Sequence, residues 1–187
     1  MSKNDDINLG RFISLILRHK PETIGIKLDR EGWADTDELI NGINASGRHI
    51  DMETLERIVR ENNKKRYSFS PDKKRIRANQ GHSIPVDVGM TEKQPPDVLY
   101  HGTSESFLES IKAEGIKHMS RLYVHLSADT DTAYTVGKRH AKNGRVAILV
   151  IDTKRMYEDG YKFMISENGV WQSSDIPWEY VSGVISK

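Results

Sequence analysis

The chain contains 187 residues with a formal net charge of +1, and 36% of them are hydrophobic while 29% are charged. This length and composition favour a soluble globular protein of one domain or two small ones. No apolar run approaches the roughly 18 residues needed to cross a membrane, and the N-terminal segment lacks the apolar core of a signal peptide. The chain has no cysteine, which excludes disulfides and thiolate metal sites and fits a cytoplasmic protein. We also expect a monomer with no membrane partner.

Basic residues are unevenly distributed along the chain. Residues 1–85 contain 16 Lys and Arg against 13 Asp and Glu, whereas the remainder contains 12 against 14. Between Lys64 and Arg77, seven basic residues accompany a single acidic one, Asp72. Such a patch suggests a polyanionic partner, although a solvated basic hairpin would show the same pattern.

The first predicted element is an amphipathic helix that ends before Pro21. Asn8 is its candidate N-cap, and Pro21 disfavours helical geometry at Lys20. Its apolar positions follow a helical period and are Leu9, Phe12, Ile13, Ile16 and Leu17. The helix therefore ends in a basic group formed by Arg18, His19 and Lys20. These side chains either cap the negative end of the helix dipole or form a phosphate site.

Two further helices and a hairpin follow. Residues 25–28 are predicted to form a short strand. Asp35 and Asp51 are placed to cap the two helices. The inward residues of these helices are Leu39, Ile40, Ile43, Leu55, Ile58 and Val59. Residues 65–70 and 75–78 alternate as strands around a turn, which indicates a basic β-hairpin.

Three helices followed by a basic hairpin are typical of a winged helix, a module that often binds nucleic acid. We therefore predict a winged-helix RNA-binding lobe over residues 1–84 and a Pro- and Gly-containing linker over residues 85–96. Residues 97–187 change in character and form a lobe rich in strands, so the predicted fold class is α+β. Its expected strands are 98–100, 122–127, 146–151, 161–165, 169–172 and 181–185, and its expected helices are 106–115 and 129–142.

Two histidine motifs on these strands carry candidate chemistry. They consist of His101, Gly102 and Thr103 after the first strand, and of Tyr123, His125 and Ser127 on one face of the next. A glycine after a strand lets backbone N–H and C=O groups approach a planar amide ligand, and His101 could bond to a ribose hydroxyl. Each motif alone would also fit a structural turn or a core histidine. No third ligand stands at metal spacing, so no metal site is expected.

Seven sequence blocks stand in order along the chain and match one family together. They are 17–21 (LRHKP), 29–33 (DREGW), 65–68 (KRYS), 77–83 (RANQGHS), 100–103 (YHGT), 123–127 (YVHLS) and 168–171 (NGVW). With these blocks the chain resembles the RNA 2'-phosphotransferase family, and in particular its bacterial members. These are NAD-dependent enzymes that remove the 2'-phosphate left at a tRNA splice junction. The resemblance covers nearly the whole chain.

The resemblance implies a C-terminal ADP-ribosyltransferase-like mixed β lobe, with the active site in the cleft between the lobes. It also implies a metal-free reaction of 2'-phosphorylated RNA with NAD as co-substrate. First, the RNA 2'-phosphate attacks the nicotinamide-bearing ribose carbon, nicotinamide leaves, and an RNA-2'-phospho-ADP-ribose intermediate forms. The ribose 2''-hydroxyl then attacks phosphorus, which releases RNA with a 2'-OH and ADP-ribose 1'',2''-cyclic phosphate.

The family's catalytic Arg-His-Arg-Arg set corresponds, by resemblance, to Arg18, His19, Arg66 and Arg121. Three guanidinium groups can hold a dianionic phosphate and balance the charge that grows at phosphorus in the second step. His19 can stabilise the phosphate or transfer a proton, and both roles remain open.

For NAD, the resemblance assigns a His-Tyr/His-variable signature to His101, His125 and Val170. A carboxylate in the third place would mark a protein-modifying transferase, so Val170 favours the phosphotransferase branch. The other implied NAD contacts are Gly102, Thr103 and Ser127 near nicotinamide and its ribose, and Gln80 and His82 near adenosine. Gln172 and Ser173 depart from the family pattern, which has a more apolar residue and a threonine there.

Two other functions stay open at this point. A winged-helix regulator whose C-terminal lobe senses a ligand would explain the basic hairpin. It would not explain why Arg18 and His19 lie away from the expected recognition helix at 52–62. An ADP-ribosyltransferase that acts on protein or on nucleic-acid phosphate ends would share the NAD residues.

Overall fold

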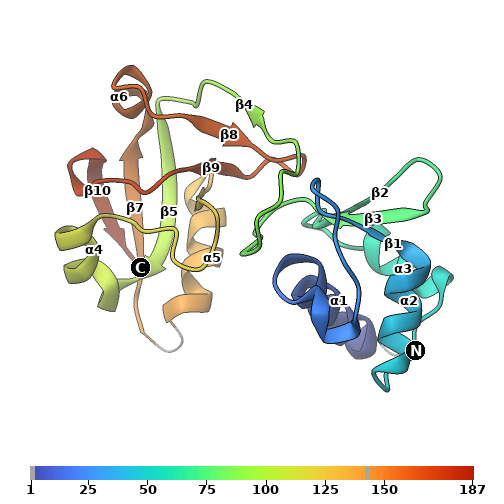
Figure 1. Cartoon of the computed structure of the whole chain (residues 1–187). Helices are drawn as coiled ribbons and strands as arrows, with labels where there is room; N and C mark the ends of the chain where they lie inside the picture. Colours follow the sequence, from blue (N-terminus) through green and yellow to red (C-terminus); the bar gives the residue numbers. More distant parts are fainter. Residues whose placement is uncertain (1–2, 142–143) are drawn as a thin grey trace. The chain divides into compact units, whose positions relative to one another are not determined.

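The computed structural model describes residues 3–141 and 144–187 and divides the chain into two compact units, Met1–Gly89 and Met90–Lys187. Each unit mixes helices with antiparallel sheet around its own core (Figure 1). The predicted linker, residues 85–96, is shared between them. Asp87 N donates to Arg30 O at 2.9 Å in the first unit, and Lys93 N donates to Phe163 O at 2.9 Å in the second.

The first unit contains three α-helices and one short 3-10 helix. They are α1 (Lys3–Arg18), η1 (Pro21–Ile24), α2 (Thr36–Ala45) and α3 (Met52–Arg60). The predicted caps of α2 and α3 are confirmed, because the Asp35 carboxylate accepts from Glu38 N and the Asp51 carboxylate accepts from Thr54 N.

Helix α1 begins earlier than predicted. It starts at Lys3 and not at the expected cap Asn8, with Asp5 and Asp6 in its first turn. Two acidic residues there stabilise the positive end of the helix dipole. Asp6 also accepts two bonds from Arg57 of α3, at 2.9 Å from Nε and 3.0 Å from Nη2. This forked ion pair fixes the first turn of α1 against α3.

A three-stranded antiparallel sheet completes the first unit in the order β1-β3-β2. Its strands are β1 (Trp33–Asp35), β2 (Tyr67–Phe69) and β3 (Arg75–Ala78). The predicted hairpin is therefore confirmed, and Trp33 lies opposite Arg77 across β1 and β3. The predicted strand at 25–28 is wrong. Gly25 ends η1 in a left-handed conformation (φ 73°), so the chain turns there and does not extend.

The second unit holds two antiparallel sheets. One sheet has the order β10-β7-β5 and the other the order β4-β8-β9-β6. Their strands are β4 (Thr91–Glu92), β5 (Val98–Ser104), β6 (Val124–Leu126), β7 (Val146–Asp152), β8 (Phe163–Ile165), β9 (Trp171–Ser173) and β10 (Val181–Ser186). A bridge between Tyr100 and Ser127 joins the sheets, with backbone bonds of 2.9 and 2.8 Å.

Short helices flank these sheets. They are η2 (Glu105–Phe107), α4 (Leu108–Glu114), α5 (Thr130–Ala141), α6 (Thr153–Glu158) and η3 (Trp178–Tyr180). The predicted helix at 106–115 is thus a 3-10 turn followed by α4. The predicted helix at 129–142 is α5, and its expected last residue, Lys142, and the expected stop at Asn143 lie outside the described residues.

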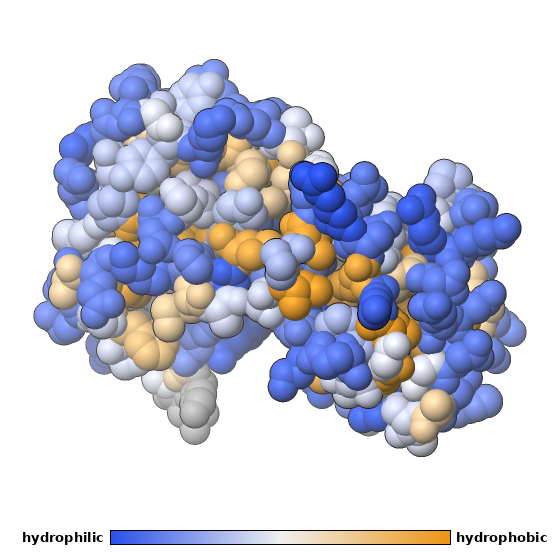
Figure 2. Space-filling view, viewed as in Figure 1, coloured by the Kyte–Doolittle hydropathy of each residue, from blue (hydrophilic) through white to orange (hydrophobic). Residues whose placement is uncertain are grey.

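Helix α5 packs closely on β5 because two glycines remove side chains from the contact. A Cβ at Gly102 of β5 would lie 1.7 Å from Ala133 O, and a Cβ at Gly137 of α5 would lie 3.0 Å from Thr103 O. Hydrophilic residues cover most of the face shown in Figure 2. Within the described ranges, no helix is both long enough and apolar enough to span a membrane.

Candidate active site

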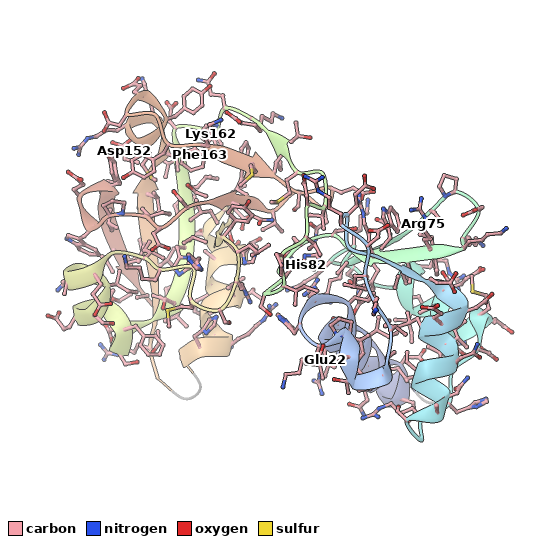
Figure 3. The ribbon with its side chains drawn as sticks, viewed as in Figure 1. Glu22, Arg75, His82, Asp152, Lys162 and Phe163 are labelled. Carbon is pink, nitrogen blue, oxygen red and sulfur yellow. The ribbon has the colours of Figure 1, made fainter. Side chains whose placement is uncertain are left out.

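In the first unit, the segment after β3 folds back onto the C-terminal end of α1. Ser83 N donates to Arg18 O at 3.0 Å, and Ser83 Oγ lies 2.9 Å from His19 Nδ1. Gly81 has a positive φ of 86°, and a Cβ there would lie 3.6 Å from Arg18 Nη1. Figure 3 labels His82 on this segment. The loop therefore holds Arg18 and His19 against residues 81–83.

Arg66 reaches the same cluster from the start of the hairpin. Its Nη1 donates to Asn62 Oδ1 at 3.3 Å, and its carbonyl accepts from Asn79 N at 2.9 Å. The pKa of the neighbouring Tyr67 is raised, chiefly by burial. Its bond with Ser14 and the charges of Arg18 and Arg66 lower the pKa and offset part of that rise. The two guanidinium groups thus act on one phenol. The structure brings Arg18, His19 and Arg66 into one region of the first unit.

His82 lies at the centre of this cluster. It is 3% exposed, and its Nε2 has no hydrogen-bond partner among the described residues. Burial, followed by the positive charges of Arg18, His19 and Arg77, lowers its pKa to about 4. His82 is therefore neutral at pH 7 and can donate or accept a hydrogen bond without adding charge.

The depressed pKa of His82 predicts a loss of stability in acid. A histidine whose pKa is lower in the folded protein than in the unfolded chain stabilises the fold fully above pH 6.5. This stabilisation is lost as the pH falls toward 4. Between pH 7 and pH 4 we expect the unfolding free energy of the wild type to fall by about 3 kcal/mol more than that of His82→Gln. Urea unfolding at a series of pH values measures this difference. His49→Gln removes an exposed histidine and is the control; equal pH dependence of the wild type and His82→Gln would contradict the prediction.

Arg77, to which no sequence motif assigned a role, joins the cluster from β3. Its guanidinium lies 4.5 Å from the centre of the Trp33 ring, a cation–π contact that orients it, and its charge acts on His82. Strand alternation could have placed Arg77 on the same face as Arg75. It could not have shown that residues 79–83 fold back beside it.

In the second unit, the structure brings together His101, His125 and Arg121. His101 Nδ1 lies 3.1 Å from the carbonyl oxygen of His125, so that nitrogen carries the proton and donates. Burial lowers the pKa of His101, so its Nε2 carries no proton and can accept a hydrogen bond. Arg121 Nη1 donates to His125 Nδ1 at 2.5 Å, which leaves the His125 proton on Nε2. The two imidazoles therefore present one acceptor and one donor.

Arg139 and His140, at the end of α5, also belong to this region, although no sequence motif pointed to them. Partial burial, followed by the charge of Arg139, lowers the pKa of Arg121. Partial burial and the charges of Arg121 and Arg139 likewise lower the pKa of His140. A group of cations suits an anionic ligand.

Gly102 presents its backbone at the gap between the two sheets. The N–H and C=O of Tyr100 bond to Ser127 and not to β7. Because hydrogen-bonding direction alternates along an antiparallel strand, the N–H and C=O of Gly102 point the same way. Thr103 is buried against α5, and Ser127 is half-buried beside this edge. The edge offers a donor and an acceptor side by side, which matches a carboxamide.

The remaining predicted NAD residues stand on other segments of the chain. Val170 is half-buried at the turn before β9, where its N–H donates to Ser166 Oγ at 3.1 Å. Gln80 and His82 belong to the first unit, with the predicted catalytic set. Among the described residues, no three His, Asp or Glu side chains come together as metal ligands.

Comparisons with known proteins give the same family that the sequence blocks suggested. The model of the RNA 2'-phosphotransferase, Tpt1 / KptA family matches residues 4–175. This protein belongs to that family. A Fusobacterium nucleatum protein, named a probable RNA 2'-phosphotransferase, is 60% identical over 178 residues, covering 95% of this chain and 98% of its own. Relatives with the same name from Flavobacterium johnsoniae and Burkholderia lata are 47% and 48% identical, covering 97% and 95% of this chain and 98% and 90% of their own.

Membership in the RNA 2'-phosphotransferase family offers a reason for the cations in each unit. A member must bind a phosphorylated RNA, and arginine forks are the side chains best suited to a phosphate dianion. The first unit supplies Arg18, Arg66 and Arg77, and the second supplies Arg121 and Arg139. Each group is held by contacts within its own unit.

Proposed function

We propose that this protein removes a 2'-phosphate from RNA by transferring it to NAD. The observation that carries the proposal is the gathering of Arg18 and His19 against residues 81–83, in a chain matched over residues 4–175 by the RNA 2'-phosphotransferase family. The products are RNA with a 2'-OH, nicotinamide and ADP-ribose 1'',2''-cyclic phosphate.

We infer that the first unit is a winged-helix lobe that binds RNA. Three helices and the β2–β3 hairpin support this inference, as does the basic segment between Lys64 and Arg77. We infer that the second unit is an ADP-ribosyltransferase-like lobe that binds NAD. The two sheets joined at Tyr100 and Ser127, with histidines on both sides of the join, support that assignment.

The residues of the second unit fit a nicotinamide nucleoside. The backbone edge of Gly102 can pair with the carboxamide, the Nε2 acceptor of His101 can bind a ribose hydroxyl, and Ser127 lies beside that edge. When bound, NAD supplies an electrophilic ribose carbon and a neutral leaving group. The protein's part in the first step is to align the phosphate oxygen with that carbon and to exclude water.

In the first step, a 2'-phosphate oxygen forms a bond to the ribose carbon as the bond to nicotinamide breaks. In the second, the ribose 2''-hydroxyl bonds to phosphorus, the RNA 2'-oxygen leaves, and the hydroxyl proton passes to a base or to that oxygen. Arg18, Arg66 and Arg121 stabilise the charge on the phosphoryl oxygens. His19 is held by Ser83 and either stabilises the phosphate or carries the proton.

The test is incubation of the purified protein with a 2'-phosphorylated oligonucleotide and NAD, without added metal. We expect NAD-dependent loss of the phosphate and formation of the cyclic phosphate product. Binding of the oligonucleotide without turnover would instead indicate a winged-helix regulator. An ADP-ribosylated RNA or protein that forms and does not react further would indicate a transferase of that kind. Either outcome would overturn the proposed function.

A further inference from the structure

Gln172 is a buried amide with an unsatisfied donor. It lies in the middle of β9 and is 2% exposed, yet its side-chain Nε2 has no hydrogen-bond partner among the described residues. A buried amide without a partner destabilises a folded protein and is rare in native structures. The pairing of β9 with β6 and with β8 uses backbone groups and does not need a polar side chain at this position. The position is also one where the family resemblance led us to expect an apolar residue.

Strand register places Gln172 beside the candidate site. It pairs directly with His125 on β6 and with Met164 on β8, so these three side chains share one face of the sheet. The opposite face is the core of the second unit, which includes Val124, Phe163 and Trp171. Gln172 therefore points away from that core, toward the side on which His125 lies.

The groups beside Gln172 are donors. Arg121 Nη1 donates to His125 Nδ1 at 2.5 Å, and a guanidinium group has donors and no acceptor. The charge of Arg139 acts on the same guanidinium. Positively charged hydrogen-bond donors together with an amide N–H require a negatively charged acceptor. Phosphoryl oxygens have that chemistry.

We propose that the Gln172 side-chain amide donates a hydrogen bond to a phosphoryl oxygen of the substrate bound at Arg121. The proposal rests on the proposed function and adds to it a ligand-contacting residue in the middle of β9. The oxygen belongs either to the 2'-phosphate of the RNA or to the pyrophosphate of NAD. Binding of two separate probes distinguishes these sources.

Gln172→Leu separates a ligand role from a structural role, because the two predict opposite shifts in stability. Leucine has nearly the same size and removes the unpaired amide, so the thermal midpoint of the ligand-free protein should rise by about 3 °C. Binding should weaken by about tenfold for the probe that carries the contacted phosphoryl group. The probes are ADP-ribose and a 2'-phosphorylated oligonucleotide, each titrated by calorimetry.

Ser173→Ala is the matched control. Ser173 is fully buried on the opposite face of β9, and its hydroxyl donates to Lys162 O at 3.3 Å. This variant should lower the thermal midpoint and bind both probes as the wild type does.

Two results would overturn the role of Gln172. One is a lower thermal midpoint for Gln172→Leu, which would mean that the amide has a structural partner. The other is unchanged affinity for both probes. Neither readout uses turnover, so a wild type that binds the probes and lacks activity would refute the proposed function and leave the Gln172 contact intact.

Discussion

Replacing Arg66 by alanine is expected to lower the turnover of 2'-phosphorylated RNA by about a thousandfold and to make the ADP-ribosylated RNA accumulate. In the proposed mechanism the second step should be slowed most, because charge builds up at phosphorus in that step. Arg121→Ala, in the other unit, is expected to give the same adduct. Separation of labelled RNA species over time measures both the rate and the intermediate.

Arg60→Ala is the control for loss of a positive charge. Arg60 lies at the end of α3, with Nη2 3.8 Å from Glu61 and 68% of its side chain exposed. Its turnover should stay within about twofold of the wild type, since an exposed surface charge contributes little. Thermal unfolding of each variant verifies that it is folded. Wild-type turnover in both Arg66→Ala and Arg121→Ala would exclude these arginines from the phosphate site.

Gly102→Ala should cost the second unit about 4 kcal/mol or more of unfolding free energy. The added Cβ would lie 1.7 Å from Ala133 O and 2.9 Å from Gly137 N, and both are backbone atoms of α5. Backbone atoms cannot rotate away as a side chain can, so α5 has to leave β5. The urea midpoint and the soluble fraction on expression measure the loss.

Gly10→Ala is the matched control for this substitution. A Cβ at Gly10, within α1, would meet Ile58 Cγ2 at 3.7 Å, which is an ordinary contact. Alanine is the better helix former, so this variant should gain up to about 1 kcal/mol. A Gly102→Ala protein as stable as the wild type would mean that the close packing of α5 on β5 is wrong.

Elements with strong local signals could be predicted from the sequence. Asp35 and Asp51 mark helix starts because a short carboxylate bonds to the N–H groups of the next turn, and the β2–β3 hairpin follows from its alternation and turn. Strand β1 was missed because three residues carry no periodicity and it exists only by pairing with β3. Strand β4 was assigned to the linker for the same reason, since its partner β8 comes much later in the chain.

The candidate site also combines residues that the sequence identifies with features that only the fold reveals. Residue types and their positions led to Arg18, His19, His101 and His125, and the family resemblance led to Arg66. The burial of His82 and the unpaired amide of Gln172 depend on how distant segments pack. No local pattern encodes such contacts, so these two features required the fold.

The cation cluster around His82 affects the stability of the ligand-free protein. Folding places Arg18 and Arg77 near His82, whose pKa their charges lower, so a bound polyanion would stabilise the folded first unit. Sulfate or phosphate in a storage buffer would partly replace that polyanion by binding the folded state alone. Stability measured in such buffers would therefore overstate the robustness of the enzyme in a dilute chloride solution.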